Sequence, residues 1–482
     1  MRFPAIFYLL GRLFCLVSIA MIVPIIGALI YSETSVLHAL ILTDVIVLSM
    51  GASMIIINYK SRDSPIAIRE GFLLVTLLWL GISIVGALPY WLTGVFPSFV
   101  DAFFESTSGF TTTGASVLMD IEAVPHAILL WRSLTQWIGG MGIIVLAVAI
   151  LPQLSVGGMQ LMRNEMPGPT FEQLKPRIRQ TAMSLWKVYV LFSVMLWALL
   201  YSAGMPIFDS ICHMFSTMSS GGFSVKNASM AAYSPTIQMI ITIFMFLAGL
   251  NFVLHYHWLK GDFRRLFEDN EFRFYSCFLI IAAGSIFLEL IFRLGMPILE
   301  AIRVVFFQVI SISSSTGYAT TDYEQWPYLS KGILFLLMFV GGCSGSTSGG
   351  FKAIRVQLFL LKTKSTLIKQ IFPKAVTAVK IGKKPVSSDV LDGVSNLFLV
   401  SVVIFSGCTL VLLAFNISFV TATSAVVACL SNVGPGFELV GPEQNYAWFP
   451  DAIKVLLALC MIVGRLEFFT ILVLFLPVAW KR

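Results

Sequence analysis

The sequence predicts an all-α polytopic membrane protein that repeats one structural unit four times. Of its 482 residues, 57% are hydrophobic and only 12% are charged, whereas about one quarter of a typical soluble domain is charged. Apolar runs long enough to span a hydrocarbon core of about 30 Å alternate with charged loops. Four short stretches rich in Ser, Thr and Gly each lie between two such runs. We therefore predict pseudo-fourfold symmetry, with each repeat a helix, a half-helix, a loop and a second helix.

The first two apolar runs form a unit of their own. Residues 16–30 and 39–57 are joined by a short turn and predict a helical hairpin. No Ser/Thr/Gly stretch follows it, so we place residues 1–69 outside the repeat. The first run follows Arg2 and Arg12 without a small-residue cleavage site, which favours a retained transmembrane helix over a signal peptide.

The remaining chain divides into repeats at residues 70–182, 183–271, 272–394 and 395–482. Each repeat contains one apolar segment about half the length needed to cross a membrane, and we expect ten full crossings and four half-helices in all. The expected half-helices end near Phe110, begin at Pro206, and cover 298–312 and 419–430. The expected long helices are 72–91, 126–151, 185–201, 237–259, 275–292, one beginning at Gly332, 397–415 and 452–478.

The four Ser/Thr/Gly stretches predict a site that removes water from a small cation. Backbone carbonyls and hydroxyls can replace a hydration shell, and glycine permits the backbone angles that point carbonyls at one axis. A single stretch would indicate an ordinary turn, but four in matching context favour a selectivity filter. The candidate ion-binding residues are Thr111, Thr112, Thr113 and Gly114; Ser219, Ser220, Gly221 and Gly222; Ser315, Thr316 and Gly317; and Asn432, Val433 and Gly434.

The fourth stretch differs from the others. Thr112, Ser220 and Ser315 offer hydroxyls where the fourth stretch has Asn432. We therefore expect ion coordination without strict fourfold symmetry.

Small residues mark the second long helix of each repeat. They are Gly139–Gly140, Gly249, Gly341–Gly342 and Gly464, and they either line the pathway below the filter or let helices pack closely. In the third repeat, residues 341–350 contain five glycines and no aliphatic side chain. Because glycine costs up to about 1 kcal/mol in a helix, we predict a break there.

Arg465 lies inside an apolar run, where an unpaired arginine costs roughly 3 kcal/mol on insertion scales. If the helix continues to Lys481, about fifteen residues or roughly 20 Å separate the arginine from the surface. We therefore predict that Arg465 faces a water-filled pathway.

Basic residues set the expected orientation. They gather in loops on one side, and residues 352–384 hold nine Lys and Arg and no acid. By the positive-inside rule, this side and both termini are cytoplasmic, and the filter opens outward. The 352–384 loop is either charge at a lipid surface or a docking surface, and both interpretations can hold together.

Several long strings resemble the Trk/Ktr/HKT superfamily of cation transporters, namely 103–106 (FFES), 109–115 (GFTTTGA), 136–142 (QWIGGMG), 165–169 (EMPGP), 341–347 (GGCSGST) and 464–467 (GRLE). The resemblance implies a potassium-uptake subunit of the bacterial inner membrane, a homodimer, and a TrkA-like cytoplasmic nucleotide-binding partner. In plant relatives, serine at the first filter glycine accompanies sodium preference, so glycine at all four positions implies K⁺. The resemblance also implies an intramembrane gate formed by Gly341, Gly342, Ser344, Gly345, Gly349, Gly350 and Arg465.

Two alternatives remain open at this point. A proton- or sodium-coupled symporter would use intramembrane carboxylates, for which Glu105 and Glu467 are candidates. A membrane-embedded enzyme would need paired aspartates, an HExxH helix or a nucleophile–histidine set. The sequence contains no such constellation, so we expect no enzyme, no cofactor beyond the transported K⁺, and no nucleic-acid partner.

Overall fold

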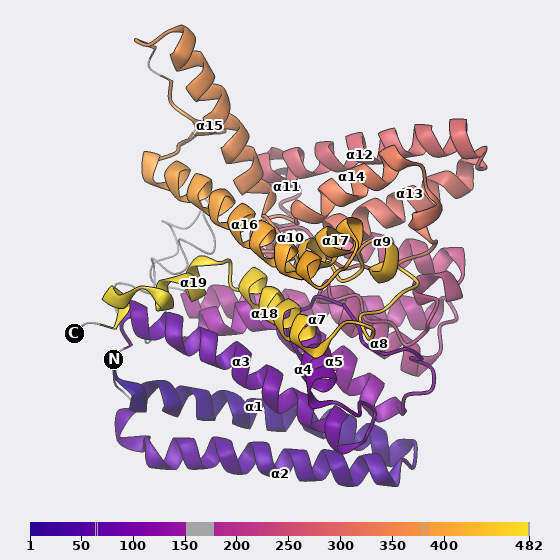
Figure 1. Ribbon diagram of the computed structural model, residues 1–482, viewed down its shortest axis with the longest axis vertical. Coiled ribbons are helices and arrows are strands. Elements are labelled where there is room, and N and C mark those ends of the chain that lie inside the picture. Colours follow the sequence, from indigo (N-terminus) through magenta and orange to yellow (C-terminus); the bar gives the residue numbers. More distant parts are fainter. Residues whose placement is uncertain (63, 65, 151–177, 376, 383, 481–482) are drawn as a thin grey trace.

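The computed structural model describes residues 1–62, 64, 66–150, 178–375, 377–382 and 384–480. In this part of the chain, long helices lie side by side, and the two ends of the chain lie at the same end of the bundle (Figure 1). The named strands within the described residues are β1 (Lys380–Ile381) and β2 (Lys384–Pro385), which pair antiparallel. The predicted all-α membrane fold is confirmed.

The predicted N-terminal hairpin consists of α1 (Phe3–Ile30) and α2 (Thr34–Ile57), which form an outer layer of the bundle (Figure 1). The two helices cross at Gly11 and Gly51, where a Cβ on Gly11 would lie 2.7 Å from the Gly51 carbonyl oxygen. Helix α1 begins earlier than expected, because the residues after Phe3 are also mostly apolar.

The four repeats follow in order. Their half-helices are α4 (Phe99–Phe110), α8 (Ile207–Met218), α13 (Ile298–Ser313) and α17 (Phe419–Leu430). The helices that precede them are α3 (Ile68–Leu92), α7 (Ile178–Ser202), α12 (Asn270–Leu294) and α16 (Ser388–Ala414). The helices that follow them begin with α5 (His126–Ile150), α9 (Pro235–Ala248), α14 (Tyr328–Phe339) and α18 (Asp451–Arg465).

Two runs that were predicted to be continuous helices are bent, and this part of the prediction is wrong. Run 237–259 turns by 105° between α9 and α10 (Phe252–Leu259), and run 452–478 turns by 105° between α18 and α19 (Phe469–Leu472). Asn251 starts α10, since its side chain accepts a hydrogen bond from the Val253 N–H at 2.9 Å.

The second helix of repeat 3 is divided, as predicted. Helix α14 stops at Phe339, and α15 (Ala353–Ile371) begins after the glycine-rich segment. Among the described residues, six helices are long and apolar enough to cross a membrane, or eight if each bent pair is one span. The other two expected crossings correspond to α5 and to the divided pair α14 and α15.

Two large apolar clusters form most of the core of the described residues, and a third, small one joins α15 to α16. Of the large clusters, one lies mainly in the hairpin and repeats 1 and 4, and the other mainly in repeats 2 and 3. Some of the predicted features lie outside the described residues. They are a basic loop with Arg163, Lys175 and Arg177, the string 165–169 within it, and Lys383. The proposed boundaries between the units stay predictions.

Candidate ion pathway and gate

The four Ser/Thr/Gly stretches share one backbone conformation. The residue two positions before each glycine is left-handed, with φ of +54° at Thr112, +56° at Ser220, +55° at Ser315 and +53° at Asn432. The glycines also have positive φ, from +75° to +97°. Non-glycine residues rarely adopt positive φ, so its recurrence at matching positions shows that one local structure occurs four times.

The left-handed residue closes each half-helix in the same way. In the first repeat, the Thr113 N–H donates to the Ser108 carbonyl at 2.9 Å and the Thr112 N–H donates to the Gly109 carbonyl at 3.0 Å. These two bonds are the Schellman ending of a helix. The outer bond, which matches Thr113 to Ser108, is also donated by Gly221 to Ser216 (2.8 Å), by Thr316 to Ser311 (2.9 Å) and by Val433 to Ala428 (2.8 Å).

The four stretches meet in a closed ring, with each glycine facing the carbonyl oxygen just before the next repeat's glycine. A Cβ at these glycines would lie far inside contact distance of that oxygen. The distances are 2.3 Å from Gly114 to Gly221 O, 1.7 Å from Gly222 to Thr316 O, 2.0 Å from Gly317 to Val433 O and 2.6 Å from Gly434 to Thr113 O. We call this arrangement the glycine ring.

The fourth stretch is tethered differently, as its asparagine suggested. Asn432 Nδ2 donates to Thr113 Oγ1 at 2.9 Å and to the Met461 carbonyl at 3.0 Å. The amide therefore joins the fourth stretch to the first. The effect of this asymmetry on ion coordination stays a prediction.

Two side chains that were not among the predicted site residues hydrogen-bond to the backbone of the glycine ring. Gln136 Nε2 donates to the Gly221 carbonyl at 2.6 Å, and its Oε1 accepts from the Phe223 N–H at 3.1 Å. The Tyr446 hydroxyl donates to the Gly434 carbonyl at 2.8 Å. Gln136 belongs to one of the strings that carried the family resemblance, whereas nothing in the local sequence singled out Tyr446.

Glu105, a candidate for ion coupling, is fully engaged in structural contacts. Its carboxylate lies 2.6 Å from Arg132 Nε and accepts from the Val117 N–H at 2.9 Å. Arg132 in turn donates to the Ser224 carbonyl at 2.9 Å and lies 3.5 Å from the centre of the Phe223 ring. A buried charge requires such compensation, so this ion pair braces the first half-helix against the second stretch.

The segment between α14 and α15, residues 340–352, lies against the glycine ring, and we call it the gating loop. The Thr347 Oγ1 and the Ser220 Oγ are 2.7 Å apart, and the Gly349 N–H donates to the Ser315 Oγ at 2.6 Å. A Cβ on Gly349 would lie 2.4 Å from the Ser431 carbonyl oxygen. The gating loop therefore contacts three of the four stretches. Thr347 was absent from the predicted gate residues, because one hydroxyl in a Ser/Gly run carries no distinguishing signal.

Arg465 holds this loop. Its side chain is buried, with Nη1 donating to the Thr347 carbonyl at 2.8 Å and Nη2 donating to the Gly139 carbonyl at 3.1 Å. The predicted position beside the loop is found. The argument from its distance to the membrane surface is wrong, because α18 ends at Arg465 and the chain then turns sharply.

One carboxylate, that of Glu271, joins the gating loop to the first turn of α15. Glu271, at the start of α12, accepts from the Ser344 N–H at 2.6 Å and from the Ile354 N–H at 3.1 Å. Beyond the loop, Arg355 and Glu467 form an ion pair at 2.5 Å. Glu467, the second candidate carboxylate, is therefore also paired.

The bend between α9 and α10 also holds the gating loop. The Gly249 carbonyl accepts from the Cys343 N–H at 2.8 Å, and the Phe252 N–H donates to the Gly345 carbonyl at 3.2 Å. Asn251 before an apolar run is a recognised helix-start signal, so this break could have been found from the sequence.

Two of the small residues pack helices closely. A Cβ on Gly139 would lie 1.8 Å from the Phe110 carbonyl oxygen, and one on Gly464 would lie 1.9 Å from the Leu430 carbonyl oxygen. Both glycines thus sit against the end of their own repeat's half-helix. For these two positions, the geometry favours close packing over lining of the pathway.

The loops outside the half-helices contain ordered acidic groups. Glu438 accepts hydrogen bonds from the Ser418 and Thr421 hydroxyls, and its N–H donates to the Glu324 carboxylate at 2.7 Å. The Ser418 hydroxyl bond is the main cause that holds the pKa of Glu438 below its ordinary value. This carboxylate is therefore charged at neutral pH.

The fold and the site together define a polytopic membrane protein with a pseudo-fourfold ring of re-entrant loops, the architecture of a cation-transport protein. A model of the TrkH family, described as "Cation transport protein", matches residues 38–481, and the chain belongs to this family. It is 40% identical over 488 residues to the Trk system potassium uptake protein TrkH of Salmonella typhimurium, with both chains fully covered. It is 35% identical to the Trk system potassium uptake protein TrkG of Escherichia coli K12, over 98% of each chain.

A solved structure shows the same fold. The crystal structure of the potassium transporter TrkH from Vibrio parahaemolyticus matches with a TM-score of 0.90 and 35% identity, and the match covers 100% of each chain. The family resemblance drawn from the sequence is thereby confirmed.

Proposed function

We propose that the chain is a potassium-selective uptake pathway of the bacterial inner membrane, with the glycine ring as its filter. Carbonyl oxygens of the ring would replace the hydration shell of K⁺. Glycine at all four positions supports K⁺ as the ion, and so do the relatives, which are named as potassium uptake proteins.

The observation that carries this proposal is the direct bonding of the gating loop to the glycine ring. Two of the proposed filter hydroxyls, on Ser220 and Ser315, already bond to Thr347 and Gly349. A loop that occupies these groups competes with a hydrated ion for the same space. We therefore propose that the conformation described here is the plugged one and that ions pass when the loop moves away.

A cytoplasmic partner could move the loop through α15. This helix begins at Ala353, directly after the loop, and projects away from the bundle (Figure 1). Lys364 and Lys369 on it are exposed, whereas Lys362 pairs with Asp392 at 2.7 Å. We propose a TrkA-like nucleotide-binding subunit as the partner, with a homodimer of this chain and both termini in the cytoplasm.

The coupled symporter is the weaker alternative. Its two candidate carboxylates, Glu105 and Glu467, both sit in ion pairs with buried arginines. A group that must bind and release a coupling ion would have to leave such a pair, which is costly in a buried site.

Ion flux into liposomes that contain the purified chain tests the proposal. With equal inward gradients of K⁺ or Na⁺, we expect K⁺ flux to exceed Na⁺ flux, and Gly114→Ser to reduce this preference. Gly204→Ser is a matched control, because Gly204 also has positive φ (+91°) but has open space where a Cβ would stand. Equal K⁺ and Na⁺ flux in the parent would refute the proposed selectivity.

A further inference from the structure

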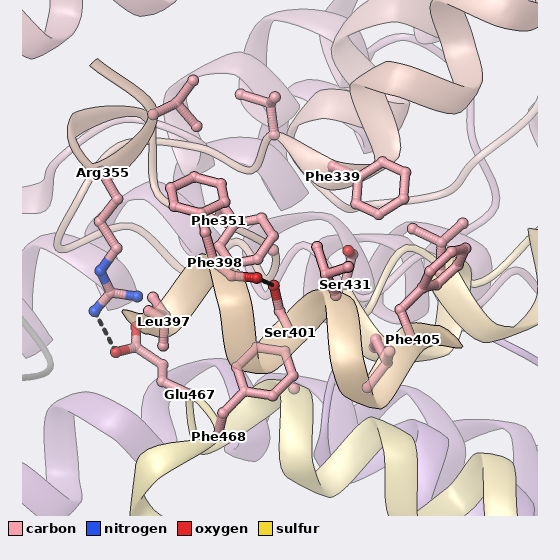
Figure 2. Close-up of a pocket in the computed structure, with 17 residues that line it drawn as sticks. Phe339, Phe351, Arg355, Leu397, Phe398, Ser401, Phe405, Ser431, Glu467 and Phe468 are labelled. Carbon is pink, nitrogen blue, oxygen red and sulfur yellow. Dashed lines mark hydrogen bonds and ion pairs between the residues drawn. The ribbon is translucent and has the colours of Figure 1, made fainter. Parts of the chain in front are cut away.

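A cavity of about 230 Å³ lies beside the gating loop, between α16 and the end of α18 (Figure 2). Phe398 and Phe405 of α16 line it together with Phe351 and Phe468, and the Phe351 and Phe398 rings are stacked at 4.5 Å. Its volume exceeds that of an engineered apolar cavity of about 150 Å³ that binds benzene. The space is therefore large enough for part of an apolar ligand.

Three polar side chains at this cavity already have partners within the protein. The Ser401 hydroxyl donates to the Phe398 carbonyl at 2.8 Å, and Arg355 pairs with Glu467 at one end (Figure 2). A water molecule needs two to four polar partners to be held in a cavity. The lining favours a hydrocarbon occupant over water.

The cavity reaches the lipid-facing side of α16. Val402 lines it and is 57% exposed. Its neighbours Leu399 and Val403 are also strongly exposed and apolar, as expected for a helix surrounded by hydrocarbon. Membrane acyl chains are thus the apolar groups present at the highest concentration at its mouth.

Charge favours an anionic lipid. Helix α15, whose first turns contribute Arg355 and Val356 to the lining, carries four Lys and Arg and no acid. Anionic lipids of the cytoplasmic leaflet are attracted to such basic segments. A head group held near α15 would place an acyl chain at the cavity mouth.

The walls of the cavity belong to the plugged arrangement. Gly350 and Phe351 follow Gly349, which bonds to the Ser315 hydroxyl, and Gly464 precedes Arg465, which bonds to the Thr347 carbonyl. A ligand that binds one conformation better shifts the equilibrium toward it. An occupant that fits these walls therefore stabilises the loop against the glycine ring.

We propose that this cavity binds one acyl chain of an anionic membrane phospholipid and that its occupancy favours the plugged gate. The binding half of this proposal stands on the cavity alone. The effect on the gate rests on the proposed function.

Photolabelling tests the binding half. The full chain is reconstituted with phosphatidylglycerol that carries a diazirine in its acyl chain, and labelled residues are mapped by mass spectrometry. We expect label on Phe351, Phe398 and Phe405, and a loss of this label of about tenfold in Ser401→Leu, because the larger side chain narrows the space in which an acyl chain can pack. Val402→Trp, at the mouth, should give the same loss, whereas Leu399→Trp on the outer face should leave it unchanged.

Three results would overturn the binding half. The first is label confined to Leu399 and Val403, which would indicate surface lipid only. The second is crosslinks to a second copy of the chain at these residues. The third is equal labelling by free fatty acid and by phosphatidylglycerol. The last result would show that the head group plays no part in recognition.

Potassium flux tests the regulatory half. Raising the share of phosphatidylglycerol at constant total lipid should lower basal flux in the parent and leave Ser401→Leu unchanged. A parallel fall in both proteins would overturn the regulatory role. Absence of K⁺ flux in every preparation would instead refute the proposed function, and the labelling result would still decide the cavity.

Discussion

Arg465→Ala is expected to raise K⁺ flux in the absence of any partner. The guanidinium bonds to the Thr347 carbonyl of the gating loop at 2.8 Å and to the Gly139 carbonyl of α5 at 3.1 Å. Gly139 is not part of the loop, so the Thr347 bond is the one that opening must break. That bond stabilises the plugged conformation and is absent from the open one.

The expected magnitude follows from this single bond. A hydrogen bond that involves a charged group contributes about 1.5–3 kcal/mol to stability. Because each 1.4 kcal/mol is a factor of ten, its loss should raise the ratio of open to plugged molecules roughly 10- to 150-fold. If Arg465 borders the ion pathway, as predicted from the sequence, removal of its positive charge acts in the same direction, since that charge would repel cations.

The assay is K⁺ flux into liposomes, normalised to the amount of correctly inserted protein. Arg465→Lys separates the two effects, because it keeps the charge and one donor for the Thr347 carbonyl, and a smaller rise than in Arg465→Ala is expected. Thermal unfolding of each variant in detergent checks that the fold is retained. Equal basal flux in Arg465→Ala and the parent would refute the reasoning and leave Arg465 a packing residue.

Three other substitutions test separate parts of the site. Thr347→Val removes the hydroxyl contact with Ser220, and at 0.5–1.5 kcal/mol per bond basal flux should rise roughly 2- to 12-fold in the liposome assay. Glu105→Gln leaves a buried guanidinium without its counter-charge, which should cost about 3–5 kcal/mol in unfolding free energy, measured by thermal unfolding. Replacing Lys364 and Lys369 with Gln should weaken capture of a purified TrkA-like subunit at physiological salt while the K⁺/Na⁺ flux ratio stays constant.

Each of these predictions has a result that contradicts it. Unchanged flux in Thr347→Val would show that its hydroxyl does not hold the plug. A Glu105→Gln variant that unfolds like the parent but loses the pH dependence of uptake would favour proton coupling. Capture of the partner at the parent level by the double lysine variant would leave α15 a lipid-surface helix.

The sequence predicted the parts that repeat. Each half-helix was visible because a short apolar segment ended at a Ser/Thr/Gly stretch, and the structure closes all four with the same Schellman bonds. The glycines mark places where a carbonyl of the next repeat approaches within 2.6 Å of the Cβ position. Such positions can be recognised in the local sequence, because no residue with a Cβ fits there.

The sequence did not predict the parts created by contacts between repeats. The turn after α18 contains no proline, and Glu467 and Phe468 adopt positive φ there. Arg465 and Glu467 find their partners, Thr347 and Arg355, more than a hundred residues away in repeat 3. The bend after α18 therefore coincides with contacts to distant residues, and no sequence pattern near residue 465 predicts it.

The bonds that hold the gating loop also indicate how much binding free energy a regulatory partner must supply to open the gate. Five contacts tie the loop to different repeats, namely Ser220–Thr347, Ser315–Gly349, Arg465–Thr347, Glu271–Ser344 and Gly249–Cys343. At about 1 kcal/mol for each of the three neutral contacts and about 1.5–3 kcal/mol for each of the two that involve a charged group, they favour the plugged form by roughly 6–9 kcal/mol if all are lost on opening. A regulatory subunit would therefore have to bind the open form roughly 6–9 kcal/mol more tightly than the plugged form to make the two equally populated. Loss of the Arg465–Thr347 bond would lower this requirement by about 1.5–3 kcal/mol.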